Sequence, residues 1–414
     1  MNRKEWKDRL KKMDIILFGA GYYAKLFFRD FSGDYNIVGC ITNNPNEMFL
    51  SIDGNEVCPI GRVKKAIEAI NGHCYIICAS AKASEMEEQL WSLGLVPGKN
   101  YCSSDMFRLI VSEKQIAVSF GVCYMRAIHD CLRKSSSFIK DYEVFYSLSY
   151  LKRNAAEDFF LKFIVSICDL YIYNITLSPV ERRKQEEILR YLSSKAKTIS
   201  IPVISAGAYY PQAGNMDSWS NPYGIVSSKT RWGSFTSPDH NINSMLECGL
   251  VTEEIVKSVS DIHYYDKLQL ENIYEKDIRG IELAESIADI KISDFIKKNR
   301  GVKRLFINES HISNEVMIEL TRRIMMKLGY SDDLPSEELL TMQLVNTTEV
   351  PIYPSVIEGL DLEVYKNEPM YRLFTFKGIK MVTFEEYVRL YCDYCNNMMR
   401  YLNDGFFPDT RRQV

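Results

Sequence analysis

The feature that most constrains the fold is a unit that occurs twice: a short apolar run, a glycine turn and a helical pattern. The first unit has the run DIILF at 14–18 and the turn Gly19-Ala20-Gly21, and the second has IAVSF at 116–120 and the turn Gly121-Val122-Cys123. Strands that alternate with helices favour a mostly parallel sheet. We therefore predict an α/β protein with a small parallel-sheet domain over 1–112. A larger α/β domain with many helices and a helical C-terminal extension is predicted over 113–414.

The first glycine turn is a candidate phosphate site. Glycines at the start of a helix let backbone N–H groups approach a phosphate closely. Strands predicted at 36–41 and 74–79 and a helix predicted at 83–93 complete this α/β unit. The acidic residue that would bind the ribose of NAD is absent after the second strand, which argues against NAD-dependent redox chemistry. The candidate nucleotide-binding residues are Gly19, Gly21, Tyr22, Tyr23 and Asn43.

Residues 13–110 resemble the Rossmann-like nucleotide-sugar-binding domain found at the front of sugar acetyltransferases and other polysaccharide-biosynthesis enzymes. The resemblance lies in the segments ILFGAGYYAKLF, IVGCITNNPN and GNEVCPIGRV. It implies a nucleotide sugar at the first glycine turn. The alternative is a domain that keeps this fold and binds nothing, because fold does not fix function.

The second glycine turn places Cys123 where a strand passes into a helix. Unpaired N–H groups and the helix dipole at such a position favour an anion and lower the pKa of a thiol. Cys123 is therefore a candidate nucleophilic thiolate, or a residue that binds a phosphate or a thioester carbonyl. The alternative is a small apolar cysteine packed at a turn.

Further polar side chains follow the other strands predicted in the second domain. Strands are predicted at 168–174, 199–204 and 305–307, and Ser313 is predicted to cap a helix over 315–328 that ends at Gly329. Ligands of parallel sheets collect at the carboxyl ends of the strands. One shared cleft is therefore predicted for the residues just past the strand ends: Cys123, Asn174, Tyr209 and His311.

The second domain resembles the WcbI-like family over residues 114–400. The resemblance lies in FGVCYMRAIHDCL, CDLYIYNITL, IPVISAGAYYPQ, SPDHNINSMLECGLVTEEI, FINESHISNEVMIELTRRIMMKLGY and VPIYPSVIEGLDL. These capsule and polysaccharide-biosynthesis proteins look like coenzyme-A-dependent acetyltransferases. The family block Gly-Asn-Cys-Gln here reads Gly121-Val122-Cys123-Tyr124, and the block Asn-His-Pro reads Ser310-His311-Ile312. The cysteine and the histidine are kept, while the flanking Asn, Gln and Pro are not.

The chain has only five histidines, so each can be considered in turn as a candidate general base. His311 is the strongest candidate, because it lies between a strand end and a helix start, and a neutral imidazole can take a proton from a thiol or a sugar hydroxyl. His240, in a polar turn, is a second candidate for the catalytic site. His73 and His263 are interpreted as structural, and His129 is interpreted as a helix-surface histidine, with a position that faces the cleft as its alternative. Glu309 and Asp239 are candidates to orient an imidazole.

We expect coenzyme A as the cofactor. Its phosphates pair with cationic side chains, and its adenine ring stacks on aromatic side chains. The candidate residues for coenzyme A binding are Gly121, Tyr124, Arg126, Tyr209, Tyr210, Lys229, Arg231, Ser313 and Asn314, with Trp232 as a further aromatic. Surface charge and ordinary packing are the alternative explanations. No metal is predicted, since Cys392-x-x-Cys395 has no second pair and no nearby His.

Composition narrows down the cellular compartment of the protein and the kinds of partner it can bind. A net charge of −3 excludes a strongly basic nucleic-acid footprint. Eleven cysteines, an odd and scattered set, suit a reducing cytoplasm. The N-terminus has no apolar signal region, and the apolar stretch 159–173 is shorter than the ~20 residues of a membrane helix. We predict a cytoplasmic protein that works beside a membrane only through partners such as other polysaccharide-biosynthesis proteins, and a homo-oligomer is an open alternative.

Three functions remain open from the sequence. The first is acyl transfer from acyl-CoA to a sugar of a capsule or cell-surface polysaccharide, either through a Cys123 thioester or by direct attack with His311 as base. The second is a binding module for coenzyme A or a nucleotide sugar without turnover, suggested by the lost Asn, Gln and Pro. The third is a Cys-dependent esterase or thioesterase.

Overall fold

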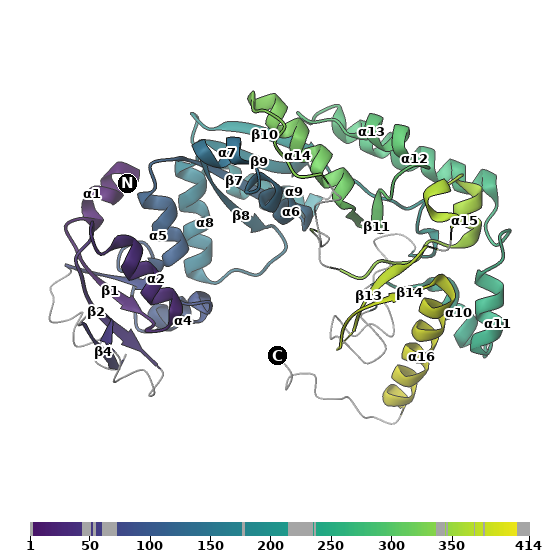
Figure 1. Ribbon diagram of the computed structural model, residues 1–414, viewed down its shortest axis with the longest axis horizontal. Coiled ribbons are helices and arrows are strands. Elements are labelled where there is room, and N and C mark those ends of the chain that lie inside the picture. The colour runs from purple at the N-terminus through teal and green to yellow at the C-terminus, as the bar shows by residue number, and fades with distance from the viewer. Residues whose placement is uncertain are drawn as a thin grey trace. The chain divides into compact units, whose positions relative to one another are not determined.

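The computed structural model (Figure 1) describes residues 3–43, 51–52, 55–59, 73–175, 179–213, 235, 237–336, 344, 347–367, 369–375 and 377–403. The chain forms two compact units. Unit 1 comprises Met1–Gly121, Ile139–Ile172 and Ser178–Thr198, and unit 2 comprises Val122–Phe138, Tyr173–Leu177 and Ile199–Val414. The domain boundary between residues 112 and 113 stays a prediction.

A six-stranded sheet in unit 1 has the order β3-β4-β2-β1-β5-β6. All described neighbours pair in parallel except β3 and β4. Strands β1 and β5 are apolar and almost fully buried, as expected when helices cover both faces of a sheet. The strands are β1 Asp14–Phe18, β2 Ile37–Thr42, β3 Ser51–Ile52, β4 Asn55–Pro59, β5 Cys74–Cys78 and β6 Tyr101–Ser103; the helices are α1 Arg3–Leu10, α2 Tyr22–Phe31, α4 Ala83–Ser92 and α5 Ser104–Val111.

The turn between β1 and α2 requires glycine at position 19. Gly19 has φ +114°, a conformation that side chains with a Cβ rarely adopt. A Cβ at this position would lie 2.8 Å from the carbonyl oxygen of Ala79, which follows β5. The glycine therefore lets the turn pass close to the neighbouring strand end.

A second sheet, of four strands, has the order β10-β9-β7-β8, and β7 pairs with β8 in parallel. Its strands are β7 Gln115–Gly121, β8 Tyr142–Leu148, β9 Leu170–Ile175 and β10 Lys197–Pro202, and nearby in the chain are the helices α8 Ala155–Ile167 and α9 Pro179–Leu189. The start of β7 is fixed within unit 1, because Ile116 N donates to the Asp169 carboxylate at 2.9 Å.

In unit 2, the helices α6 (Tyr124–Leu132) and α14 (Asn314–Leu328) pack against each other and run in the same direction. The thiol of Cys131 in α6 contacts the hydroxyl of Thr321 in α14. Beyond the carboxyl ends of both helices, the rings of Phe138 and Tyr330 are in contact, with their centroids 5.3 Å apart. Two contacts in the same order along both segments indicate a parallel pair, so the first residues of α6 and α14 lie at the same end.

The other elements of unit 2 are mostly helical, and one of them, α7, continues into the residues of unit 1. They are α7 Ser136–Asp141, η3 Pro211–Ala213, α10 His240–Glu247, α11 Thr252–Val259, α12 Lys267–Glu285, α13 Ser293–Asn299, β11 Phe306–Asn308, β12 His311–Ile312, α15 Pro354–Gly359, η6 Glu363–Tyr365, β13 Tyr371–Thr375, β14 Gly378–Val382 and α16 Phe384–Asn403. The strand expected at 305–307 is not part of the parallel sheet. It is β11, which pairs antiparallel with β12 in a separate two-stranded sheet.

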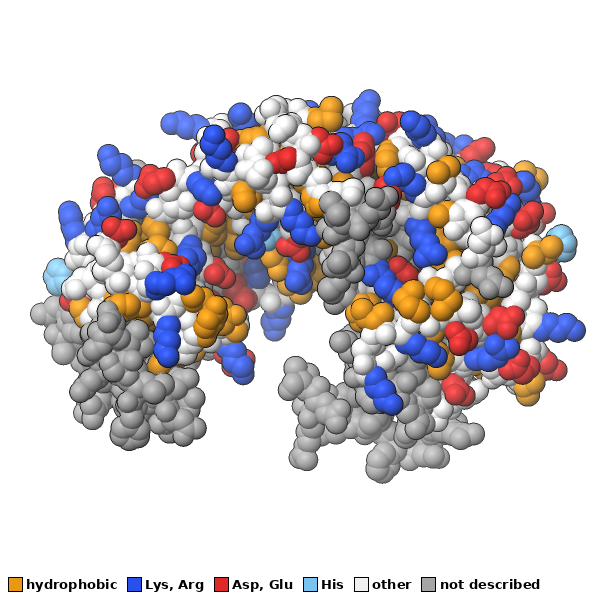
Figure 2. Space-filling view, in the orientation of Figure 1, with side chains coloured by type: hydrophobic (Ala, Val, Ile, Leu, Met, Phe, Trp, Pro, Cys, Tyr) orange, Lys and Arg blue, Asp and Glu red, His pale blue; other side chains and the backbone are white. Residues whose placement is uncertain are grey.

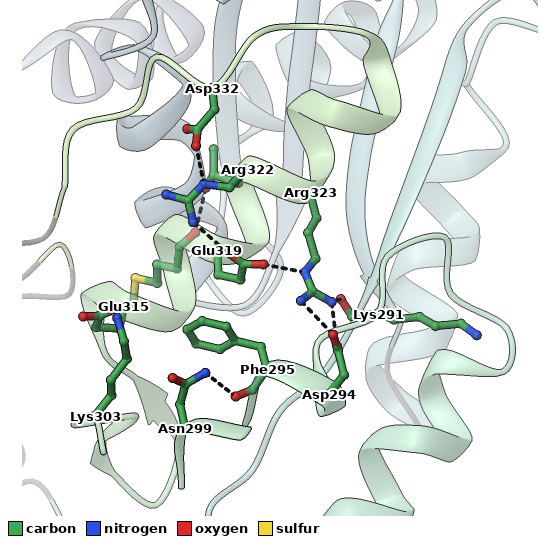
Figure 3. A network of polar contacts seen from close by, with 12 residues as sticks. Lys291, Asp294, Phe295, Asn299, Lys303, Glu315, Glu319, Arg322, Arg323 and Asp332 are labelled. Atoms are coloured by element: carbon green, nitrogen blue, oxygen red, sulfur yellow. Dashed lines mark hydrogen bonds and ion pairs between the residues drawn. The ribbon is translucent and has the colours of Figure 1, made fainter. Parts of the chain in front are cut away.

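Helix α14 is held on its outer side by a network of ion pairs (Figure 3). Arg323 bridges Asp294 in α13, at 2.6 Å, and Glu319 one turn earlier in α14, at 2.7 Å. Arg322 pairs with Asp332 and with Glu319. These pairs connect α14 to α13 and to the segment that follows α14.

Replacement of Arg323 with Ala tests how much this network contributes. Because Arg323 joins two carboxylates while keeping only 24% of its side chain exposed, we expect a loss of about 1 kcal/mol and a melting temperature lower by about 2–4 °C. The matched control is Arg279→Ala, whose i,i+4 pair with Glu275 is mostly exposed. Equal changes in the two variants would contradict a special role for the network.

The described architecture confirms the predicted α/β class. Among the residues that the structure describes, no helix combines the length and the apolar character that crossing a bilayer requires. On the face shown in Figure 2, Lys and Arg are interspersed with Asp and Glu rather than gathered by sign.

Candidate active site

Cys123 lies in the short link between β7 and α6. Gly121 at the end of β7 has φ +151°, and Val122 N donates a 2.9 Å hydrogen bond to the Asn174 side-chain oxygen. Asn174 is buried near the end of β9. The amide of Asn174 therefore fixes the backbone immediately before Cys123.

The thiol of Cys123 does not have the lowered pKa that its position at a helix start predicts. Burial raises the pKa of the Cys123 thiol, and the backbone N–H groups of Tyr124 and Cys123 oppose this effect only in part. The expectation of a resting thiolate is therefore corrected, because loss of water costs the anion more than the helix start returns. At neutral pH Cys123 is a thiol.

His311 begins β12 and faces its own hairpin partner. Its Nδ1 lies 2.9 Å from the side-chain oxygen of Asn308, the last residue of β11. Ser310 N, which can only donate, binds the same atom at 3.1 Å, so this atom is the amide oxygen. An oxygen accepts, so Nδ1 carries the proton and the lone pair lies on Nε2. Burial lowers the pKa of His311, which keeps the ring neutral at pH 7.

The two carboxylates predicted as candidates to orient an imidazole have other partners. Glu309 accepts from the Ser237 hydroxyl at 2.9 Å, and burial raises its pKa. Asp239 accepts from the Tyr353 hydroxyl and caps α10 through Ile242 N. The residue that orients His311 is Asn308, which sequence reasoning missed. The available signal was its position at the end of an apolar strand, three residues before a candidate base.

The parallel pairing of α6 and α14 brings Cys123 and His311 to one end of the helix pair. Cys123 directly precedes α6, and His311 comes three residues before α14. The two segments are 188 positions apart in the sequence, and the contacts between α6 and α14 place the helices that follow them side by side. A thiol and a neutral imidazole with its lone pair on Nε2 are suited to the handling of thioesters and hydroxyl protons.

The structure buries several of the predicted coenzyme A residues, and their role at coenzyme A stays a prediction. The rings of Tyr124 and Tyr209 are buried, and their hydroxyls donate to the carbonyl oxygens of Pro202 and Arg300. Tyr210 is buried but lines a pocket, together with Ser313. Arg126 is exposed on α6, and the side-chain oxygen of Asn314 accepts from Leu344 N at 2.8 Å. Lys229, Arg231 and Trp232 lie outside the described residues.

The other histidines and the cysteine pair lie outside the β7–α6 link and the β11–β12 hairpin that carry Cys123 and His311. His240 is the first residue of α10, and His129 in α6 contacts Asp130 at 2.9 Å. His73 and His263 are exposed. Cys392 and Cys395 are buried in α16, and burial raises the pKa of both thiols. In the described part of the chain, no three His, Cys, Asp or Glu residues come together as metal ligands.

Asp239 provides a test of the buried polar core beside α10. Burial raises the pKa of Asp239 to about 7, despite hydrogen bonds from Ile242 N and the Tyr353 hydroxyl. An unfolded Asp titrates near 3.9, so between about pH 4 and 7 the folded carboxyl holds a proton that the unfolded one releases. Its contribution to stability is therefore present below pH 4 and is lost as the pH rises to 7.

We expect Asp239→Asn to flatten the pH dependence of urea unfolding between pH 5 and 7. The slope removed has an upper limit of about 1.4 kcal/mol per pH unit. Asp393→Asn, which changes an exposed carboxylate on α16, is the control and should leave the slope unchanged. An unchanged slope in Asp239→Asn would contradict the raised pKa.

In unit 1, the structure brings all five predicted nucleotide-binding residues together. Gly19, Gly21, Tyr22, Tyr23 and Asn43 line one pocket of about 450 Å³ at the carboxyl ends of β1 and β2. The same pocket is lined by Lys82, Glu85 and Gln89 of the α4 region. Asn43 donates to the Gln89 side chain at 2.6 Å. The glycine turn thus forms one wall of a polar pocket of ligand size.

Comparisons with known proteins find relatives for the part of the chain that contains Cys123 and His311. The family model described as polysaccharide biosynthesis enzyme WcbI matches residues 116–333. A solved structure of WcbI, described as a native protein without a disulfide bond between coenzyme A and one of its cysteines, shares the fold with a TM-score of 0.56. The two are 16% identical, and the match covers 70% of this chain and 94% of that one. No curated protein matches the sequence. Because the family model spans more than half of the chain, the chain belongs to the WcbI family of polysaccharide biosynthesis enzymes.

Proposed function

We propose that this chain transfers an acyl group, such as acetyl, from acyl-CoA to a hydroxyl or amine of a sugar in capsule or cell-surface polysaccharide biosynthesis. The observation that carries the proposal is the neutral His311, whose Nδ1 is held by Asn308 so that the lone pair lies on Nε2, at the same end of the α6–α14 pair as Cys123. The WcbI structure, whose description mentions coenzyme A and a cysteine, supports coenzyme A as the acyl carrier.

Of the two routes, the raised pKa of Cys123 favours direct transfer. Nε2 of His311 takes the proton of the sugar hydroxyl while the sugar oxygen attacks the thioester carbonyl. A C–O bond forms, the C–S bond breaks, and the proton passes from His311 to the departing coenzyme A sulfur. Cys123 then shapes the thioester site and stays a thiol throughout.

The experiment is an assay of coenzyme A release and product mass with acetyl-CoA and a panel of monosaccharide acceptors. Acceptor-dependent release with an acetylated sugar as product is the expected result. Release at the same rate without an acceptor would replace the proposal with a thioesterase. Binding of coenzyme A without turnover for any acceptor would instead support a non-catalytic binding module.

For the first domain, taken as residues 1–112, we propose that the pocket at the glycine turn binds a nucleotide sugar. The pocket combines the turn at Gly19 with Lys82, which directly precedes α4 and whose exposed ammonium lies 3.5 Å from the Glu85 carboxylate, and such a cation is suited to phosphate. Lys82→Ala is expected to weaken binding of a UDP-sugar about tenfold by calorimetry, while Lys25→Ala, on α2 and outside the pocket, is the control. Absence of binding to the unmodified protein would support a domain that keeps the fold alone.

A further inference from the structure

A second pocket lies within unit 2, next to the hairpin that carries His311. It has a volume of about 240 Å³ and is lined by side chains from several separate segments, including Tyr210, Arg304, Phe306, Ser313, Tyr365 and Tyr371. Phe306 belongs to β11 and Ser313 directly follows β12. The hairpin that carries His311 therefore also forms part of the pocket wall. This volume is below the ~300–1,000 Å³ of pockets for drug-sized ligands and suits a single sugar ring.

Ser313 presents a buried hydroxyl without a partner to this pocket. Its residue is 2% exposed, and its Oγ has no hydrogen-bond partner among the residues that the structure describes. Although Ser313 is the N-cap of α14, its side chain does not make the capping hydrogen bond that serine makes at this position. A buried polar atom of this kind requires a partner, and a ligand hydroxyl or anion in the pocket supplies one.

Arg304 gives the pocket a positive charge. Its guanidinium lies over the rings of Tyr365, at 5.2 Å, and Tyr371, at 6.0 Å, and one nitrogen donates to the Met370 carbonyl. Among the described residues, no carboxylate forms an ion pair with it. The other arginine of the lining, Arg372, is neutralised by Glu349 at 2.9 Å. Within the described lining, the pocket therefore keeps the charge of Arg304 without an ion-pair partner, next to two aromatic rings.

The mouth of the pocket has an apolar edge. Met381 lines the pocket and is 46% exposed, and Ile379 on the same strand β14 is 50% exposed. Figure 2 shows hydrophobic side chains in the region of β13 and β14. An aromatic and apolar wall beside a guanidinium and a hydroxyl suits a ring with one apolar C–H face and charged or hydroxyl edges.

We propose that this pocket binds an acidic sugar, whose carboxylate or phosphate pairs with Arg304 and one of whose hydroxyls bonds Ser313 Oγ. The planar guanidinium presents paired N–H donors that match either anion. This inference rests on the proposed function, because it names the acceptor class of the same reaction. The β11–β12 hairpin forms part of the pocket wall and also carries His311, two residues before Ser313. An acceptor in the pocket would therefore lie near His311.

The test compares three ligands by calorimetry on the full chain: glucuronate, glucose 1-phosphate and glucose. At least one acidic sugar is expected to bind ten times more tightly than glucose or better, and the stronger of the two identifies the anion. Arg304→Ala is expected to abolish this preference, Arg304→Lys to keep part of it, and Ser313→Ala to weaken binding several-fold. Arg279→Ala, which changes an exposed side chain of α12, is the control and should bind like the unmodified chain.

Coenzyme A binding, measured in the same variants, separates this inference from the proposed function. Normal coenzyme A affinity in Arg304→Ala, with loss of the acidic-sugar preference, supports the inference and shows that the variant is folded. Equal binding of glucose and both acidic sugars, or an unchanged preference in Arg304→Ala, overturns it even if acyl transfer is found. Acidic-sugar binding without any acyl transfer would keep the pocket and overturn the function.

Discussion

Replacement of His311 with Gln is expected to lower kcat for acyl transfer by about 10²–10⁴-fold, the usual contribution of a positioned general base. Glutamine keeps a hydrogen-bonding side chain on the hairpin but has no basic nitrogen. Coenzyme A affinity should change little, because the lost interaction is with the acceptor proton in the transition state. His263→Gln, at an exposed position, is the matched control. A kcat within a factor of two of the unmodified chain would remove His311 from the mechanism.

The pH profile gives His311 a second readout. Burial lowers the pKa of the imidazole below its ordinary value of 6.5, so the base is lost only when the pH falls below that shifted value. The acid limb of kcat/KM is therefore expected to have its midpoint below pH 6.5. A midpoint above 6.5 would indicate a different base.

Asn308 is a positioning residue for His311. Two replacements of Asn308 distinguish the effect of a charge beside the imidazole from the effect of losing the hydrogen bond that orients it. Asn308→Asp places a carboxylate 2.9 Å from Nδ1, where it stabilises the imidazolium and shifts the acid limb to higher pH. Asn308→Ala removes the hydrogen bond that selects the tautomer, so kcat should fall by about tenfold or more with no upward shift of the limb. A purely structural role would lower the melting temperature in both variants without moving the limb.

The parts of the fold that follow from local pattern could be predicted from the sequence. The apolar run 14–18, the turn at Gly19 and the helix that ends at Gly329 all appear, and Gly329 has the left-handed conformation (φ +85°) expected after a helix end. Each depends on residues within a few positions of one another. Helical spacing, strand runs and glycine preferences are properties of such short segments.

The parts that depend on distant contacts could not be predicted. The run 305–307 has the composition of a buried parallel strand, yet its carboxyl end turns back within three residues to pair with His311. The pKa of Cys123 depends on burial in the folded chain, which outweighs the local helix start. The pocket lined by Arg304, Tyr365 and Tyr371 likewise assembles from segments separated in the sequence, so no single motif announces it.

Replacement of Cys123 with Ser is expected to abolish capture of coenzyme A as a mixed disulfide while acyl transfer stays within about tenfold of the unmodified rate. In the exchange, the Cys123 thiolate attacks the disulfide of oxidised coenzyme A, one S–S bond breaks and another forms, and a coenzyme A thiolate leaves. Serine cannot take part in this exchange. It can still fill the volume beside α6 for direct transfer.

Three outcomes distinguish the roles of Cys123, when each variant is made in a Cys248→Ser background that removes an exposed cysteine and modified peptides are identified by mass spectrometry. Because burial raises the thiol pKa, the exchange should be slow at pH 7 and accelerate with each pH unit through pH 9. A loss of acyl transfer of about 10³-fold or more in Cys123→Ser, with an acyl-Cys123 peptide in the unmodified chain, would replace direct transfer with the covalent route. Exchange already maximal at pH 7 would contradict the raised pKa and restore the resting thiolate that a helix start alone predicts.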